Sequence, residues 1–152
     1  MNLILNTDVI ITYSIKIEGN MNNKVKNQLL YTKDHEWIKI SNNEIVIGIT
    51  DFAQKQLGDI VYVDLPEKKK IFKKKEVIVV LESVKSVNDI LSPLDCKISD
   101  VNSNLIDNPE LINDHPYTKG WILKVNDALN IEKVNFFKYE EYLNFIKNIE
   151  NI

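Results

Sequence analysis

The feature that most constrains the fold of this chain is a succession of short runs rich in β-branched and aromatic residues, each ended by a turn residue. Residues 59–65 alternate in side-chain character and stop at Pro66, and residues 77–81 form a continuous apolar run. Runs of this length, bounded by turn signals, are typical of strands. Long helical patterns do not alternate with them, which excludes a doubly wound nucleotide-binding sheet. The pattern therefore predicts a mainly β fold.

Two helices complete the predicted fold. Thr50 or Asp51 can cap a short helix over residues 52–57, and Gly58 would end it. Residues 137–149 carry apolar side chains near helical spacing, which predicts an amphipathic C-terminal helix. A short helical turn is expected where Pro109 follows Asn108. Further strands are expected at residues 37–40 and 45–49, joined by a turn at 41–43, and at 90–92, 97–101 and 121–125.

The length of 152 residues favours one domain with a core of its own. Residues 1–17 are apolar but are interrupted by Asn6 and Asp8, so neither a signal peptide nor a membrane span fits. Acidic residues such as Glu18 also disfavour a mitochondrial presequence. We expect residues 1–30 to form a poorly ordered N-terminal extension and residues 31–152 to form the domain.

The charge of the chain argues against nucleic-acid binding. The sequence has 22 acidic and 19 basic residues, all of the latter lysines, and a formal charge of -3. A protein that neutralises phosphates would carry an excess of cations. Six of the lysines lie within residues 68–75. We interpret that segment as a solvated loop, with a docking patch as the alternative.

Few residues offer chemistry of their own. Cys96 has no partner for a disulfide, and with His35 or His115 it could form a nucleophile and base, but a lone cysteine is usually a small buried hydrophobe. The two histidines, with Asp34 and Asp114, have no recognised metal-ligand spacing and are expected at the surface or at caps. The glycines are isolated, so no phosphate-binding loop is formed. We expect neither a catalytic centre nor a metal site.

Several segments, in sequence order, resemble the glycine cleavage system H protein family. Glu-Ser-Val-Lys at residues 82–85, continuing to Pro93, is similar to the lipoylation hairpin of that family. The other segments are Tyr-Thr-Lys-Asp-His-Glu-Trp at 31–37, Ile-Gly-Ile-Thr-Asp-Phe-Ala-Gln at 47–54, Asp-Leu-Pro-Glu at 64–67, Asp-Asn-Pro-Glu-Leu-Ile-Asn at 107–113 and Gly-Trp at 120–121. The resemblance covers residues 31–142, which is most of the chain.

The resemblance implies a barrel-sandwich hybrid of the lipoyl-domain type. It implies that lipoate is bound covalently to Lys85 at a hairpin tip, as N6-lipoyllysine, and that the protein is a carrier without a catalytic site. Its partners would be the glycine decarboxylase (P protein), which loads the arm with an aminomethyl group, and the folate-dependent aminomethyltransferase (T protein), which unloads it. Dihydrolipoamide dehydrogenase (L protein) would reoxidise the dithiol.

The resemblance also suggests roles for the neighbours of this lysine. Glu82, Ser83 and Val84 would be read by the lipoate ligase or lipoyltransferase, which must select one lysine among 19. Glu36 and Asp89 would line a cleft that shelters the loaded arm, both as anions that pair with the positively charged aminomethyl group.

Three alternatives remain open. The chain could relay lipoate to other enzymes, or be an unmodified interaction module; a biotin carrier is disfavoured because Val84 and Ser86, rather than methionines, flank the lysine. Asp95-Cys96 and the lysine-rich 68–75 segment depart from the family pattern where glycine-containing turns are usual. We expect a monomer in the bacterial cytoplasm, with the mitochondrial matrix as the alternative, and no membrane partner.

Overall fold

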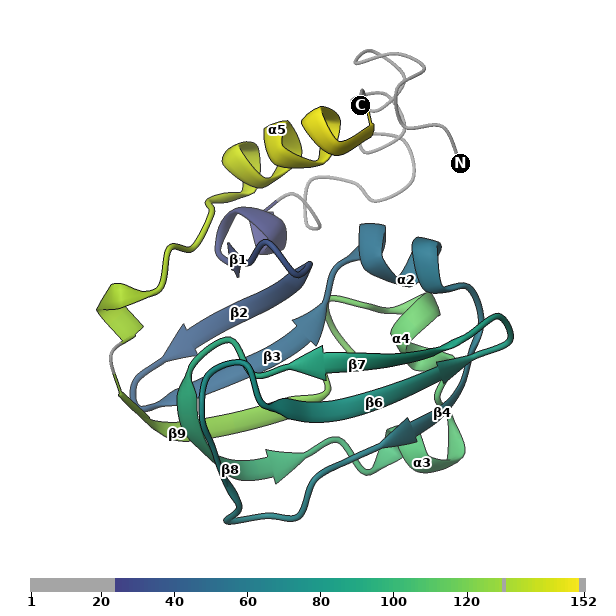
Figure 1. The fold of residues 1–152 in the computed structure, drawn as a ribbon, viewed down its shortest axis with the longest axis horizontal. Coiled ribbons are helices and arrows are strands. Elements are labelled where there is room, and N and C mark those ends of the chain that lie inside the picture. Colours follow the sequence, from purple (N-terminus) through teal and green to yellow (C-terminus); the bar gives the residue numbers. More distant parts are fainter. Residues whose placement is uncertain (1–23, 130, 151–152) are drawn as a thin grey trace.

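The computed structural model describes residues 24–129 and 131–150, which form two antiparallel sheets and a few short helices (Figure 1). The larger sheet has the strand order β1-β2-β3-β9-β8-β5, and the smaller has the order β4-β6-β7. The strands are β1 (Leu30–Tyr31), β2 (Glu36–Ser41), β3 (Glu44–Ile49), β4 (Ile60–Asp64), β5 (Ile71–Phe72), β6 (Val77–Ser83), β7 (Val87–Leu91), β8 (Asp95–Val101) and β9 (Leu123–Leu129). The helices are α2 (Asp51–Leu57), α3 (Asn104–Asp107), α4 (Leu111–Asp114), η2 (Ile131–Lys133) and α5 (Tyr139–Glu150).

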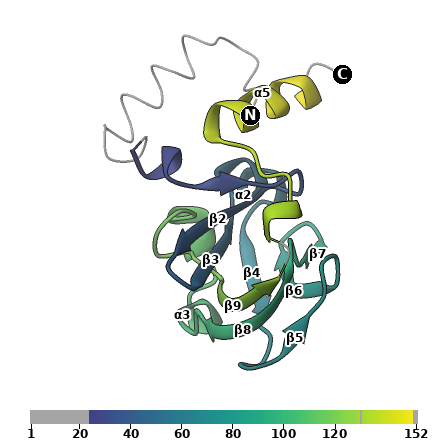
Figure 2. The same ribbon diagram turned by 90° about the vertical axis from the view of Figure 1, so that its left-hand side faces the viewer.

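The main core lies between the two sheets, which Figure 2 shows from the side. Alternate side chains along the strands point into this core: Ile45, Ile47 and Ile49 of β3 are buried, and so are Leu81 of β6 and Val125 of β9. Burial of apolar surface contributes about 25 cal/mol per Å², and it is the main force that holds the two sheets together.

A second cluster of buried residues, mostly aromatic, joins α5 to one end of the molecule. The rings of Tyr31 and Tyr142 stack with centroids 4.8 Å apart, and Trp37 and Phe52 belong to the same cluster. A bridge between Tyr31 and Phe137 ties the segment before α5 to β1. The C-terminal helix is therefore fixed by aromatic packing at the end of the six-stranded sheet.

Part of the predicted N-terminal extension belongs to the packed fold. Residues 24–27 are helical, Leu29 is buried, and Leu30 pairs with Ile38 of β2. The backbone carbonyl of Lys26 accepts a hydrogen bond from the Tyr31 hydroxyl at 2.7 Å. Packing thus begins before Tyr31, because apolar residues of 24–30 cover the aromatic cluster. Residues 1–23 lie outside the described residues.

The mainly β prediction is confirmed, with a short internal helix and a C-terminal helix. The described strands form two sheets rather than one closed barrel. The strand expected at residues 90–92 begins earlier, at Val87, because hairpin pairing with β6 extends to the tip. The helical turn expected after Asn108 is followed directly by α4, and α3 precedes it without having been predicted. None of the described helices has the length and apolar character needed to cross a membrane.

Candidate functional site

The hairpin of β6 and β7 presents Lys85 to solvent. The two strands pair up to Glu82 and Val87, and the backbone N–H of Ser83 donates to the carbonyl of Ser86 at 2.8 Å. Lys85 lies between these residues and is exposed. Strand pairing therefore holds the backbone on both sides while the side chain remains exposed to solvent.

The Ser83 side chain builds the turn beneath the lysine. Its hydroxyl oxygen accepts hydrogen bonds from the backbone N–H groups of Lys85 and Ser86, each at 3.2 Å. The same hydroxyl lies 3.3 Å from the Ser86 carbonyl, to which it donates. Serine side chains stabilise turns in this way by replacing a backbone partner. Ser83 is thus a structural part of the tip, a role that its position in the sequence did not reveal.

The tip also rests on the segment that follows α2. The backbone N–H of Val84 donates to the carbonyl of Asp59 at 3.0 Å. Gly58 has φ 78° and ψ -162°, a region open to glycine almost alone. A Cβ at this position would lie 3.2 Å from Cε and 3.4 Å from Nζ of Lys85, so the lysine stem packs on the bare glycine backbone.

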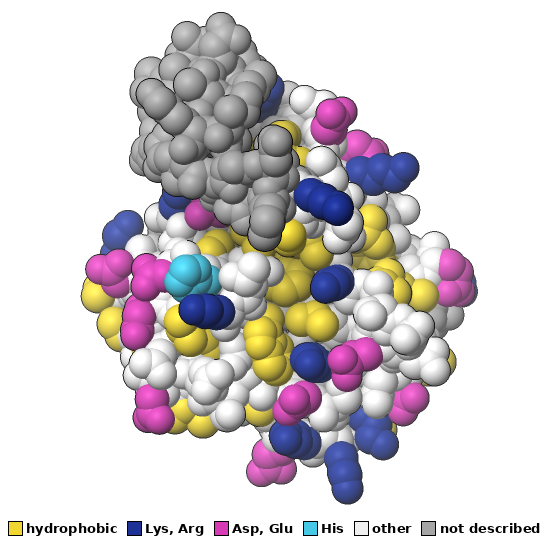
Figure 3. Space-filling view, turned by 180° about the vertical axis from the view of Figure 1, so that it is seen from behind, with side chains coloured by type: hydrophobic (Ala, Val, Ile, Leu, Met, Phe, Trp, Pro, Cys, Tyr) yellow, Lys and Arg dark blue, Asp and Glu magenta, His cyan; other side chains and the backbone are white. Residues whose placement is uncertain are grey.

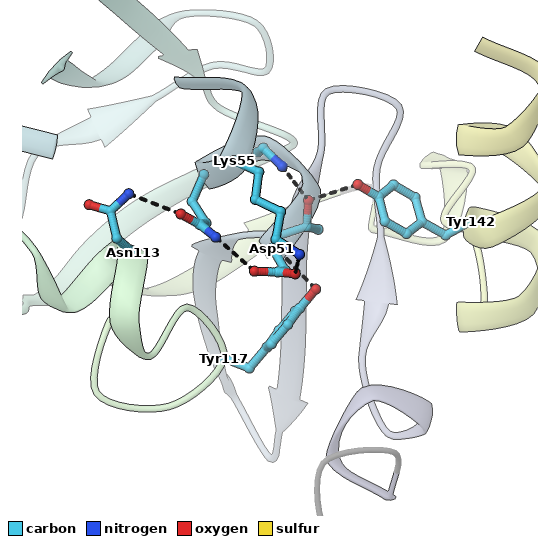
Figure 4. A network of polar contacts seen from close by, with 8 residues as sticks. Asp51, Lys55, Asn113, Tyr117 and Tyr142 are labelled. Carbon is cyan, nitrogen blue, oxygen red and sulfur yellow. Dashed lines mark hydrogen bonds and ion pairs between the residues drawn. The ribbon is translucent and has the colours of Figure 1, made fainter. Parts of the chain in front are cut away.

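A polar network holds α2 at its N-terminal end (Figure 4). The Thr50 hydroxyl accepts from the backbone N–H of Ala53 as the N-cap, and it shares a 2.7 Å hydrogen bond with the Tyr142 hydroxyl of α5. The Tyr117 hydroxyl accepts from the backbone N–H of Asp51 at 3.0 Å. These contacts fix the start of a seven-residue helix that is too short to be stable alone.

Asn113 of α4 fixes the other end of α2. Its Nδ2 donates to the Gly58 carbonyl and to Oε1 of Gln54, both at 2.9 Å, and its Oδ1 accepts from the backbone N–H of Ile60, also at 2.9 Å. Asn113 therefore forms all but one of the hydrogen bonds available to an asparagine amide, and these bonds join α4 to α2 and β4. The turn between α2 and β4 is bound to α4 through this side chain.

Glu36, predicted to line a cleft, is buried in the described structure with 1% of its surface exposed. Its Oε1 accepts from the Thr32 hydroxyl at 2.9 Å, whereas its Oε2 is buried without a partner. Burial raises the pKa of this carboxyl group to about 8, since the anion would lose its hydration. This shift favours the neutral acid over the anion, and the anionic role expected for Glu36 stays a prediction.

The other predicted residues lie near the tip or on the smaller sheet. Glu82 is half-buried on β6, opposite Tyr62 of β4, and Val84 is 66% exposed. Asp89 is exposed on β7, whereas Glu36 starts β2 in the other sheet. Within the described part of the chain, no hydrogen bond or ion pair joins Glu36 or Asp89 to the lysine. A cleft lined by both carboxyl groups stays a prediction.

The residues considered for catalysis are not brought together. Cys96 is buried in the main core, where its Sγ lies 3.6 Å from the Ser92 hydroxyl and burial raises the pKa of the thiol. His35 belongs to the aromatic end of the molecule; it is half-buried, and its Nδ1 lies 2.9 Å from the Tyr142 hydroxyl. His115 is exposed and is the C-cap residue of α4, as expected of a surface or capping histidine, whereas His35 is only partly exposed. Among residues 24–129 and 131–150, no three histidine, cysteine or acidic residues gather as metal ligands would.

A family model identifies the family to which the sequence of this chain belongs. The model described as "Glycine cleavage H-protein" matches residues 29–149. This chain belongs to the glycine cleavage H-protein family. The H protein of Halothermothrix orenii is 43% identical over 126 residues, which cover 83% of this chain and 98% of that one. The H protein of Herpetosiphon aurantiacus is 42% identical over 121 residues, covering 79% and 94%.

A solved H-protein structure has the same fold. The crystal structure of the glycine cleavage system H protein from Mycobacterium marinum superposes with a TM-score of 0.70 at 33% identity, covering 78% of this chain and 95% of that chain. The fold that carries the hairpin is therefore shared with that solved H protein.

Sequence reasoning missed the residues that support the tip. Gly58 was recognised as a helix end, but its contact with Lys85 joins positions far apart in the chain. Asn113 closes the Asn-Pro-Glu-Leu-Ile-Asn segment that carries part of the family resemblance, yet its partners could not be read from spacing. An asparagine within a predicted short helical turn was the available signal, because short polar side chains often bond to nearby backbone groups.

Proposed function

We propose that this H-protein family member is the lipoylated carrier of a glycine cleavage system, with lipoate bound to Lys85. The observation that carries the proposal is one exposed lysine at the tip of a hairpin whose backbone is fixed from three sides. A carrier needs a residue of this kind, since the protein must hold and present the group while other proteins perform the reactions.

The residues at the tip fit the lipoyl group. Within the described residues, no hydrogen bond or ion pair engages the Nζ of Lys85, which leaves the amine accessible. Val84 and Val87 are exposed beside it, and Tyr62 is 52% exposed on the neighbouring strand. Attachment forms an amide between Nζ and the carboxyl carbon of lipoate; the amine loses a proton, and AMP leaves when a ligase has activated the carboxyl group with ATP. Acylation removes the positive charge, so the arm can lie on this apolar surface.

When bound, the lipoyl group supplies a dithiolane that accepts electrons and an aminomethyl group. We assign loading to the P protein, unloading to the T protein and reoxidation to the L protein, as partners that visit the same tip in turn. Exposure of Lys85 on a narrow hairpin supports this division, because a projecting tip can enter active sites that a flat surface could not. The bacterial origin of the relatives supports a place in the bacterial cytoplasm.

For the attaching enzyme we propose that Glu82 and Val84 are the side chains read at the tip. Glu82 is half-buried and Val84 is exposed, whereas the Ser83 hydroxyl is engaged within the turn. Ser83 then contributes through the shape of the turn. The three residues predicted for recognition therefore divide into two that are read and one that shapes the tip.

We further propose that the Oε2 of Glu36 and the carboxylate of Asp89 face the loaded arm. The buried Oε2 without a partner supports this, since such an atom in a native protein requires an explanation. A neutral Glu36 would accept or donate a hydrogen bond, and a carboxylate at Asp89 would supply the charge interaction.

The proposal is tested by attachment and by turnover. Purified protein is incubated with lipoate, ATP and a lipoate–protein ligase, and the peptide spanning residues 83–89 is analysed by mass spectrometry. We expect the mass of one lipoyl group on Lys85 and none in the Lys85→Arg variant. The lipoylated protein should then support glycine decarboxylation by a P protein.

Two outcomes favour the alternatives. Lipoylation at Lys85 without any stimulation of glycine decarboxylation or aminomethyl transfer would indicate a lipoyl relay protein. Absence of any modification at Lys85, in protein isolated from its own cell and after treatment with the ligase, would indicate an unmodified interaction module and overturn the proposal.

A further inference from the structure

The hairpin tip that carries Lys85 is bound to a turn that is itself held by a third element. The turn is the segment Gly58–Ile60, between α2 and β4, whose middle residue Asp59 accepts the backbone N–H of Val84 at 3.0 Å. The Lys85 stem packs on the first residue of this turn. The position of the lysine thus depends on where the turn lies.

The turn is held by backbone contacts, from the N–H of Gly58 to Gln54 and from Ile60 to Ser83 of β6, and by one side chain that reaches both of its ends. Asn113 donates to the carbonyl of Gly58 and accepts from the backbone N–H of Ile60, so it binds the first and last residues of the turn at once. Both bonds are 2.9 Å long, and a third, to Gln54, ties the same amide to α2. A side chain that closes both ends of a turn restrains its middle residue, which is the acceptor of the hairpin.

We propose that Asn113 is a positioning residue for Lys85: by clamping the Gly58–Ile60 turn it fixes the hairpin tip at which the lipoyl group is attached. This inference rests on the proposed function, since it concerns attachment at that lysine. Asn113 acts through Asp59 and Val84 and need not touch the lysine, the cofactor or the attaching enzyme.

The flexibility of Gly58 is a reason for such a clamp. With φ 78° and ψ -162°, its backbone is in a region that glycine enters freely and other residues do not, so the residue itself does not fix the turn. A glycine released from the clamp regains more conformational freedom than any other residue. Without Asn113 the turn would sample other conformations, and Asp59 would no longer present its carbonyl to Val84.

The test compares Asn113→Ala with a matched control, Asn102→Ala. Asn102 is also an asparagine whose Nδ2 bridges two backbone carbonyls, those of Lys119 and Trp121, at 2.9 and 2.7 Å, but its partners lie away from the hairpin. Each variant is measured for thermal stability, for kcat/KM of lipoate attachment by a lipoate–protein ligase with ATP, and for amide hydrogen exchange of Val84 and Ile60.

We expect attachment to fall about tenfold in Asn113→Ala, within the range that a displacement of the reacting group of about 1 Å can produce. Exchange at Val84 and Ile60 should accelerate together. Asn102→Ala should lose stability but keep the attachment rate and the protection of Val84. Equal attachment rates in the two variants, or an unchanged Val84 amide in Asn113→Ala, would overturn the inference.

Two further measurements distinguish a failure of this inference from a failure of the proposed function. If unaltered protein is not acylated at Lys85, the proposed function fails, but hydrogen exchange at Val84 still tests the clamp. If Asn113→Ala does not fold, Asn113→Ser replaces it, and in unaltered protein the amides of Val84 and Ile60 should open with the same free energy. Different opening free energies there would contradict a shared clamp.

Discussion

At the scale of single residues, Glu36 shows how burial changes the chemistry of a side chain. The sequence places it in a His-Glu-Trp segment and gives it the appearance of an ordinary anion. In the fold it lies at the start of β2 with one oxygen bonded to Thr32 and the other without a partner. The burial that raises its pKa also makes folding depend on pH.

The first prediction concerns Glu36→Gln. Because burial raises the pKa of Glu36 from 4.5 to about 8, the folded state binds the proton more tightly, and this contribution is complete below pH 4.5 and lost as the pH rises through 8. Glutamine does not titrate, so the variant does not lose this stability as the pH rises. Its free energy of unfolding, measured with urea, should rise relative to the unaltered protein by about 2–4 kcal/mol between pH 5 and pH 9.

Subtracting the stability curve of one protein from that of the other cancels the contributions of the other titrating groups. Burial lowers the pKa of the His35 imidazole, which gives a slope of the opposite sign as the pH falls below 6.5. His35 is present in both proteins, so the difference between the two curves reports Glu36. A difference that stays constant over this range would show that the carboxyl group titrates normally.

The second prediction concerns Gly58→Ala. The φ of 78° should cost about 1–3 kcal/mol once a Cβ is present. The contact with Lys85 is a smaller effect, since its Cε, 3.2 Å from the new Cβ, is near the end of a flexible side chain that can move. Urea unfolding should therefore give nearly the same loss in a Lys85→Ala background. A loss confined to the protein that retains Lys85 would assign the cost to crowding instead.

At the scale of elements, α2 and α5 stabilise one another through the Tyr142 hydroxyl. This group meets the Thr50 N-cap at 2.7 Å and Nδ1 of His35 at 2.9 Å. One hydroxyl thus links the C-terminal helix, the start of α2 and the loop before β2. The arrangement explains why a helix of seven residues and one at the chain end are both stable.

The third prediction is that Tyr142→Phe weakens this link. Loss of a hydroxyl that bonds to the buried Thr50 and the half-buried His35 should lower the free energy of unfolding by about 1–3 kcal/mol, since each partner loses one hydrogen bond. Tyr62→Phe is the control, because Tyr62 is 52% exposed and its hydroxyl has no partner to lose among the described residues. Equal stabilities of the two variants in urea would show that the hydroxyl of Tyr142 contributes nothing.

Most elements were predictable from local patterns, and their supports were not. Thr50, the apolar residues of 52–57 and Gly58 define α2 by capping and propensity alone, and the structure agrees. Alternation and turn residues likewise located β4 and the hairpin of Lys85. The bonds from Asn113 to Gly58 and from Tyr142 to Thr50 join residues more than 50 positions apart. No local pattern encodes such pairs, because they form only when the sheets pack.

At the scale of the whole molecule, charge is distributed unevenly about the tip. By strand register, one face of the smaller sheet carries the rows Tyr62, Glu82 and Val87, then Asp64, Val80 and Asp89. These six positions include three carboxylates and no cation, whereas the lysine-rich segment 68–75 precedes the far end of β6. The back of the molecule mixes both signs around apolar side chains (Figure 3).

The fourth prediction follows from this asymmetry. The negative potential of these three carboxylates should speed the approach to Lys85 of a partner with basic residues around its active site. Asp64→Lys should lower the association rate with the lipoate–protein ligase about threefold at low salt, and added salt should reduce the difference. Lys73→Glu, at the other end of β6, should leave the rate unchanged. Equal effects of the two reversals in stopped-flow measurements would exclude steering by this face.

The burial of Cys96, the single cysteine of the chain, bears on the redox chemistry of the proposed lipoyl arm. Its thiol lies in the core near Ser92, and burial raises its pKa. A thiolate is the form that attacks a disulfide, and access to it is required for exchange. If Lys85 carries the proposed lipoyl group, a scaffold whose own sulfur is enclosed in the core would not exchange with that dithiol, and its reoxidation would be left to a partner protein.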